Sequence, residues 1–265
     1  CLMAMRSSKG LSIASGSVIA VAAWLLLWET ASRLEWLDPF LAPPPSVLFT
    51  TAWELVTEGF PDGITMQGHV VATLGRVLIG FGVAAALAIP LGIAVGYMPT
   101  LELLFGSIIT FGRSIAAISV LPLFVAWFGI GEMSKILLIA FAAFWIIITY
   151  TASSVKFVDP MLLRAARSMD AGEGTIFRSV VLPAALPRIF TGLKVGLSVA
   201  FLVIAAAEMV ATVKGLGALI QEARTSFRTD ITMVGMLAIG VIGYLTSKLL
   251  DVLAGRLMPW HRPSE

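Results

Sequence analysis

Long apolar runs alternate along the chain with shorter polar stretches. An α-helix needs roughly 20 mostly apolar residues to cross a bilayer, and six runs reach that length. They cover residues 11–31, 70–97, 105–128, 134–155, 189–213 and 231–253. Pro90 and Pro122 lie inside the second and third runs, and each predicts a kink. The pattern predicts an all-α, polytopic membrane protein in which a single domain, residues 1–265, holds six transmembrane helices.

Composition agrees with a lipid bilayer as the solvent. Of the 265 residues, 58% are hydrophobic and 13% are charged, and the mean hydropathy is +0.95. In a soluble domain about a quarter of the residues are charged. The net charge of +2 gives no indication of a nucleic-acid partner. One cysteine, Cys1, and two histidines, His69 and His261, exclude an intrachain disulfide and a Cys/His zinc site, so we expect no metal.

The basic residues predict how the chain is oriented. Arg6 and Lys9 precede the first apolar run, as in a signal peptide, but that run is long and no small-residue cleavage site follows it. We therefore expect a retained first span. Lys and Arg are more frequent in the segments that six spans place on the side of both termini, and such an excess marks the cytoplasmic side. Both termini are thus expected in the cytoplasm.

Two predicted outer loops have the pattern of short amphipathic helices. In the first loop, Ser46 is a candidate N-cap and Gly59 a candidate stop. Each helix either lies at the membrane surface or simply packs on the spans. The apolar stripes consist of Phe49, Ala52, Trp53 and Val56 in the first loop, and of Leu216, Leu219, Ile220, Ala223 and Phe227 in the last.

The predicted cytoplasmic loop 156–188 is longer than a simple connection requires. Asp159 followed by Pro160 is a strong signal for the start of a helix. Gly172 ends this helix, and Thr175 is a candidate cap for a second one. The spacing places four apolar residues on one face of the first helix, which indicates a surface for a partner. These residues are Leu162, Ala165, Ala166 and Met169.

The same loop resembles a known motif. Residues 164–170, nine further residues and then 180–183 resemble the cytoplasmic "EAA" loop of permease subunits of binding-protein-dependent ABC importers. That pattern is Glu-Ala-Ala, three residues, Gly, nine residues, a branched aliphatic residue, one residue and Leu-Pro. Arg164 stands where the family has Glu, and Asp170 stands where it has Gly. The residues that match in kind are Ala165, Ala166, Leu182 and Pro183.

Further stretches resemble one branch of that family, the permeases for nitrate, bicarbonate, taurine and aliphatic sulfonates. The resemblance implies a type I ABC importer permease in the bacterial inner membrane, carrying a small, anionic solute. It implies that two copies form a homodimeric pathway, that two cytoplasmic ATP-binding subunits each receive one coupling helix, and that an extracytoplasmic solute-binding protein delivers the solute. The stretches are 41–46, 74–81, 121–123, 127–131, 207–209 and 215–217.

By the same resemblance, the loop couples this chain to the ATP-binding subunits. The sequence contains no Gly-x-x-x-x-Gly-Lys-Ser/Thr phosphate loop, so we expect ATP and Mg to bind the partner and no cofactor to bind here. The chain is therefore not expected to be an enzyme. The expected coupling residues are Asp159, Arg164, Ala165, Ala166, Arg167, Met169, Asp170, Leu182 and Pro183.

Ionisable residues inside apolar runs are candidates for the translocation pathway because a charge in a bilayer is costly. Arg113, with Ser114 and Ser119 nearby, either attracts an anionic solute or has a structural role as an ion pair or an anchor at the membrane surface. Glu208 lies toward the end of the fifth run, and Lys214 is its expected partner. A structural or gating role suits Glu208 better than solute contact.

Three other classes of protein remain as alternatives. A secondary transporter usually has more spans and internal repeats, and this sequence has no convincing repeat. A membrane enzyme needs a cluster of His, Asp or Cys, which the sequence lacks. A membrane scaffold without an ATPase partner is compatible with the cytoplasmic helix alone. Co-purification with an ATPase subunit separates the importer from all three.

Overall fold

The computed structural model describes residues 19–34, 36–38, 40–210 and 212–260. Helices and turns make up this part of the chain, and no strand occurs in it, which confirms the all-α prediction there. The chain divides into two compact units. One combines residues 1–67 with 219–236, and the other combines residues 68–218 with 237–265. The single domain over 1–265 stays a prediction.

The first unit contains a helix over residues 19–33, α2 (Pro45–Thr57), most of α10 (Leu216–Thr225) and the start of α11 (Thr229–Leu257). Polar contacts tie these helices together. The Ser46 hydroxyl donates to Glu29 Oε1 over 2.8 Å, and the Thr51 hydroxyl donates to Asp230 Oδ2 over 3.0 Å.

Two expectations for this unit are wrong. Ser46 does not cap α2, because the helix begins one residue earlier at Pro45 and Ser46 is bonded to Glu29. Phe227 does not continue the buried stripe of α10, because the helix ends at Thr225 and Phe227 has a positive φ of 58° with 73% of its surface exposed. The other stripe residues of the last loop are buried.

Four helices are long and apolar enough to span a membrane: α3 (Met66–Tyr97), α6 (Glu132–Lys156), the helical stretch Glu173–Glu208 and α11. They correspond to the second, fourth, fifth and sixth predicted spans. The first predicted span begins in residues 11–18, which lie outside the described part of the chain. Four of the six predicted spans are therefore supported, and the total of six stays a prediction.

The third predicted span differs from the structure. Instead of one kinked helix over 105–128, α4 (Pro99–Ser114) meets the stretch Ala117–Phe128, which holds η1 (Ala117–Val120) and α5 (Leu121–Phe128), at 87°. The stretches Pro99–Ser114 and Ala117–Phe128 are long and apolar enough to cross a membrane only when they are taken together as one broken span. The backbone is extended at Ile115 and Ala116, and Pro122 lies in the first turn of α5. Proline is well tolerated there, so it begins a helix instead of kinking one.

The fifth span begins and ends earlier than the predicted 189–213. Its helical stretch comprises α8 (Glu173–Ile176), a π-helical turn over Phe177–Val181 and α9 (Leu182–Glu208). Gly172 is the N-cap of α8, so the predicted cap at Thr175 is wrong. The predicted cytoplasmic loop to residue 188 is thus mostly helix.

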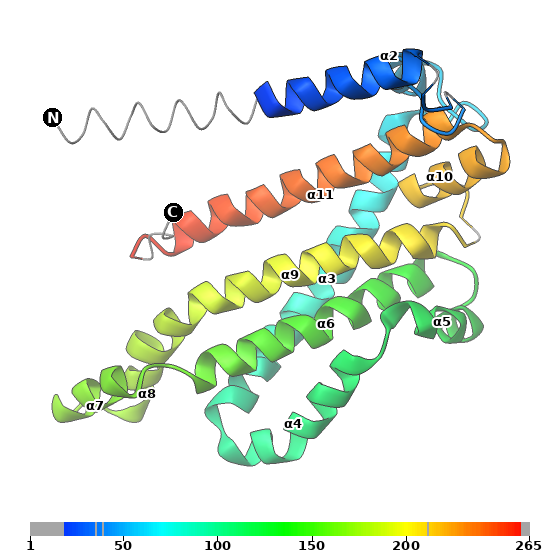
Figure 1. The fold of residues 1–265 in the computed structure, drawn as a ribbon. Coiled ribbons are helices and arrows are strands. Elements are labelled where there is room, and N and C mark those ends of the chain that lie inside the picture. Colours follow the sequence, from blue (N-terminus) through cyan, green and yellow to red (C-terminus); the bar gives the residue numbers. More distant parts are fainter. Residues whose placement is uncertain (1–18, 35, 39, 211, 261–265) are drawn as a thin grey trace, which may run out of the picture. The chain divides into compact units, whose positions relative to one another are not determined.

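Helices α6 and α9 run side by side through the second unit (Figure 1). Glycines allow this close contact: a Cβ at Gly192 would collide with Tyr150, and a Cβ at Gly196 would lie 2.9 Å from Ile147. Figure 1 shows α7 (Pro160–Ser168) and α8 at one end of the pair and α5 at the other. The α6–α9 pair therefore connects two ends of the unit, and each end carries a candidate site.

Candidate functional site

The predicted coupling helix is present as α7, Pro160–Ser168. The Asp159 carboxylate accepts a hydrogen bond of 2.8 Å from the Met161 N–H, and Pro160 occupies the first turn. This cap satisfies one of the free N–H groups at the start of the helix. The predicted helix start at Asp159 and Pro160 is confirmed.

The apolar residues of α7 lie on two faces, not one. Ala166 is 4% exposed and packs, with Leu163, into a cluster that includes Val181 and Ala185 at the start of α9. The prediction that Ala166 shares a partner-facing surface with Ala165 is therefore wrong. One residue further along a helix is a rotation of about 100°, which is enough to separate the two faces.

The outward face of α7 is apolar and exposed. Met161 is 68% exposed, Leu162 48% and Met169 77%, and Ala165 lies between them on the same side. We call these four residues the α7 stripe. Exposed apolar patches of this kind mark interaction surfaces in soluble regions. The prediction of an apolar surface on the coupling helix is thus correct for this stripe.

Charged residues border the α7 stripe. Arg164 is exposed, and its Nε lies 3.4 Å from the Pro160 carbonyl oxygen. Arg167 pairs with Glu173 over 3.3 Å at the surface. Asp170 has a φ of +57°. The motif that this loop resembles has glycine there, and Asp is among the few other residues that adopt this conformation readily. The departure at Asp170 therefore keeps the backbone turn.

Leu182 and Pro183 lie in the first turn of α9, not in an exposed loop. They follow directly on the π-helical turn, in which the Leu182 N–H donates to the Phe177 carbonyl. Both side chains are half-buried. They connect the loop to α9, and Ala166 packs against this part of the chain.

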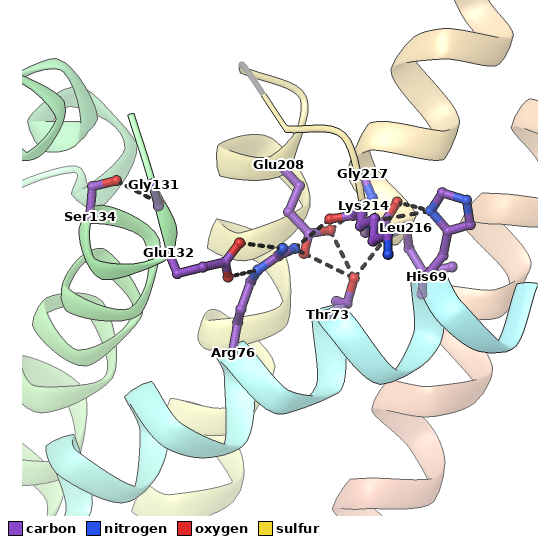
Figure 2. Close-up of polar contacts among 11 residues, drawn as sticks. His69, Thr73, Arg76, Gly131, Glu132, Ser134, Glu208, Lys214, Leu216 and Gly217 are labelled. Atoms are coloured by element: carbon purple, nitrogen blue, oxygen red, sulfur yellow. Dashed lines mark hydrogen bonds and ion pairs between the residues drawn. The ribbon is translucent and has the colours of Figure 1, made fainter. Parts of the chain in front are cut away.

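At the opposite end of the α6–α9 pair lies a buried charge network centred on Arg76 of α3 (Figure 2). Its guanidinium pairs with Glu208 at the end of α9, with Nη1 2.6 Å from Oε1. It also pairs with Glu132 at the start of α6 through Nε and through Nη2, the latter over 2.7 Å. Arg76 is 6% and Glu208 1% exposed. Charges thus join three helices, with Arg76 and Glu208 shielded from solvent and Glu132 at the surface.

Two polar side chains of α3 extend this network to the segment 214–217 (Figure 2). The Thr73 hydroxyl donates to Glu208 Oε2 over 2.8 Å and accepts from the Leu216 N–H over 2.8 Å. His69 Nδ1 lies 2.8 Å from the Gly215 carbonyl oxygen. Gly215 has a φ of +144°, and a Cβ there would collide with the Glu208 carboxylate. Only glycine fits this position.

One sequence expectation about this end needs correction. Lys214 contributes its backbone carbonyl, which accepts from Arg76 over 2.7 Å, and no ion pair joins its side chain to Glu208 among the described residues. Sequence reasoning did not include Arg76 among the candidate site residues, although it is the buried centre of the network. The available signal was a pair of opposite charges in two separate apolar runs, but the sequence does not say that these runs meet.

Arg113 lies apart from this network, in the last turn of α4 beside the break before α5. It borders a cavity of about 230 Å³ whose walls include Phe141, Trp145 and Val203. The Trp145 indole N–H is buried and has no acceptor in the part of the chain that the structure describes. Two of the residues that line this cavity, Arg113 and Trp145, therefore carry hydrogen-bond donors.

The structure does not bring the other pathway candidates to Arg113. The Ser114 hydroxyl donates to the Thr110 carbonyl and the Ser119 hydroxyl to the Ala116 carbonyl, over 3.0 and 2.7 Å. Neither serine lines the cavity, and Glu208 belongs to the buried network. No group of three or more His, Cys, Asp or Glu residues able to hold a metal occurs in the described ranges.

Comparison with known proteins identifies the family of the chain. The family model described as "Binding-protein-dependent transport system inner membrane component" matches residues 88–262. The chain is 37% identical over 246 residues to the taurine transport system permease protein TauC of Escherichia coli K12, covering 92% of this chain and 89% of TauC. It is 29% identical to the nitrate import permease protein NrtB of Synechocystis, covering 91% and 88% of the two chains.

Other relatives and a solved structure point the same way. A putative aliphatic sulfonates transport permease protein, SsuC of Bacillus subtilis, is 30% identical, covering 92% of this chain and 87% of SsuC. An inward-facing structure of the MetNI methionine ABC transporter matches the fold with a TM-score of 0.59 and 20% identity, covering 73% of this chain and 95% of that one. The chain belongs to the family of inner membrane components of binding-protein-dependent transport systems.

Proposed function

We propose that this chain is the transmembrane subunit of an ATP-driven importer and that two copies form the pathway for a small sulfonate-like anion. The observation that carries the proposal is the α7 stripe, an exposed apolar surface on a capped helix outside the spans. In this family a separate subunit hydrolyses ATP. We assign the α7 stripe and the bordering Arg164 and Arg167 to contact with that subunit.

The packing of α7 suggests how such contact would move the pathway. Ala166 and Leu163 anchor the inner face of α7 to the start of α9. A displacement of α7 by a closing ATPase dimer would therefore be passed to α9 as a rigid-body motion. The far end of α9 carries Glu208, whose ion pair with Arg76 ties it to α3. Motion of α7 could then reach the Arg76–Glu208 pair through α9 itself, without a flexible linker.

An anionic solute is supported by the relatives and by the Arg113 cavity. The relatives named above are permeases for taurine, aliphatic sulfonates and nitrate. A cavity with aromatic and aliphatic walls and two donors suits a small anion with a short apolar body. The guanidinium of Arg113 can bind an oxyanion through two parallel hydrogen bonds.

The proposal extends to the number of spans and to the side of the membrane on which the termini lie. We expect six spans, with residues 11–31 as the first and the bent α4–α5 pair as the third, and both termini in the cytoplasm. The excess of Lys and Arg on that side supports this orientation. A solute-binding protein would then deliver the anion at the end that carries the Arg76 network.

Reconstitution tests the proposal. The chain would be co-expressed with candidate ATPase and solute-binding subunits from the same genome, purified and placed in vesicles. We expect co-purification of the ATPase and uptake of radiolabelled taurine or another alkanesulfonate that requires ATP and the binding protein. Uptake by this chain alone, without ATP, would instead identify a secondary transporter, and failure of any ATPase to associate would favour a scaffold.

A further inference from the structure

Lys135, in the first turn of α6, is a buried cation outside the network already described. It is 5% exposed, and no hydrogen bond or ion pair joins its ammonium to another group in the described residues. A cation on an otherwise buried side chain, without a hydrogen-bonded partner in the described residues, usually has a counter-charge. The position therefore calls for an anion.

The neighbouring carboxylates, Glu132 and Glu208, attract Lys135 electrostatically, but no hydrogen bond or ion pair joins them to it in the described residues. Lys135 lines an open cavity of about 520 Å³ together with Arg76, Glu132 and Lys214. Both carboxylates near it, Glu132 and Glu208, are held by the Arg76 guanidinium. The three cations Arg76, Lys135 and the exposed Lys214 outnumber the two carboxylates. The cavity therefore has a net positive charge.

Two further groups at this cavity lack an acceptor. Thr212 lines it, and the buried hydroxyl of this residue has no hydrogen-bond partner in the part of the chain that is described. Gly131, the N-cap residue of α6, also lines it, and no side chain caps the helix there. The first N–H groups of a helix and its dipole attract anions. A lysine, a hydroxyl and a helix start therefore border one space.

We propose that this cavity, between the start of α6 and residues 212–214, binds a small oxyanion with Lys135 as its main ligand. Thr212 donates a second hydrogen bond, and the start of α6 contributes its N–H groups. Glu132 does not prevent binding because both of its carboxylate oxygens accept hydrogen bonds from Arg76, and Lys135 and Lys214 add two further cations to the lining. The oxyanion is either a free sulfate- or sulfonate-type solute or the phosphate of a lipid headgroup. Binding of the oxyanion at this cavity requires neither transport nor the ATPase.

Equilibrium binding of radiolabelled sulfate to the purified full-length chain in detergent, at constant chloride, tests the free-solute source. We expect saturable binding that Lys135→Met weakens by about tenfold or more, the loss that follows from removing a charged hydrogen bond. Lys135→Arg keeps the charge and should bind within about threefold of the wild type. Lys248→Met, on α11, is the matched control and should not change binding.

Thr212→Val leaves every charge in place, so it carries the test if Lys135→Met does not fold. It should weaken sulfate binding about threefold or more. Sulfate binding that is the same in the wild type, Lys135→Met and Thr212→Val would overturn the proposal.

Native mass spectrometry with phosphatidylglycerol tests the lipid source. A lipid retained by the wild type, lost in Lys135→Met and displaced by sulfate would assign the site to a headgroup. The absence of both saturable sulfate binding and retained lipid would refute the oxyanion site. None of these measurements involves the ATPase, so failure here is separate from failure of the proposed function.

Discussion

Glu208 is 1% exposed, and its carboxylate accepts hydrogen bonds from Arg76, Thr73 and the Gly217 N–H. A buried ion pair adds little net stability compared with apolar residues, but a single unpaired member is strongly destabilising. The main role of the Arg76–Glu208 pair is therefore to fix the position of α3 relative to α9.

Removing Arg76 alone should cost far more than removing both partners of this pair. We expect Arg76→Met to lower the free energy of unfolding by about 3–5 kcal/mol, since it leaves the Glu208 carboxylate buried without a counter-charge. Glu208→Gln should cost less, because Arg76 keeps its ion pair with Glu132. The double variant should recover a large part of the loss seen in Arg76→Met. Thermal unfolding in detergent measures the three variants. Glu132→Gln is the control and should cost less, because the Glu132 side chain is 61% exposed. Additive losses in the double variant would contradict the idea.

Arg113 differs from Arg76 because it lies exposed at a cavity and is not locked into an ion pair among the described residues. We expect Arg113→Ala to reduce anion uptake about tenfold or more, the loss of one charge-assisted contact, while ATPase assembly persists. Arg113→Lys should recover part of the uptake, because it restores the charge but not the two parallel hydrogen bonds. Uptake kinetics in vesicles provide the measurement, and unchanged kinetics in Arg113→Ala would remove this residue from the pathway.

At the scale of elements, patterns along the chain predict helices well and their joints poorly. Residues 134–155 and 231–253 form helices within a few residues of the predicted ends, because long apolar runs leave the backbone no alternative to helix in a bilayer. The 87° break at Ile115 and the π-helical turn before Leu182 carry no comparable signal. Both depend on how neighbouring helices pack, which hydropathy does not encode.

The two faces of α7 make a prediction that separates docking from folding. Ala165→Arg places a charge on the exposed stripe, so it should abolish ATPase association while thermal stability stays within about 0.5 kcal/mol, as for ordinary surface substitutions. Ala166→Arg forces a charge into the cluster with Val181 and Ala185, so it should loosen the loop itself. Hydrogen exchange of residues 160–168, together with co-purification, distinguishes the two.

Ala184→Arg is a matched control for both, since Ala184 is exposed on α9 outside the stripe. It should bind the ATPase and exchange like the wild type. If Ala165→Arg also retained the ATPase, the α7 stripe would not be the docking surface. If Ala166→Arg exchanged like the wild type, the inward packing of Ala166 would be unimportant for the loop.

At the scale of the whole chain, the α6–α9 pair joins two sites that the sequence treats as unrelated. Helix α7 could be predicted because the signals for its start and its apolar spacing lie in one contiguous segment. The Arg76 network could not, because Arg76 and Glu208 are 132 residues apart and Thr73 and Leu216 are 143 apart. If α9 transmits motion, loosening its far end should affect how the ATPase responds at the near end.

Thr73→Val tests this link without changing any charge. It removes the hydroxyl that holds both Glu208 and the Leu216 N–H, so residues 214–217 lose one tie to α3 at a cost of about 1–3 kcal/mol. The ATPase should still assemble, because α7 is untouched, but stimulation of ATP hydrolysis by the solute-loaded binding protein should fall. Thr149→Val is the control: its hydroxyl bonds only to the Trp145 carbonyl of its own helix, so stimulation should persist. Equal stimulation in both variants would show that the two ends of α9 act independently.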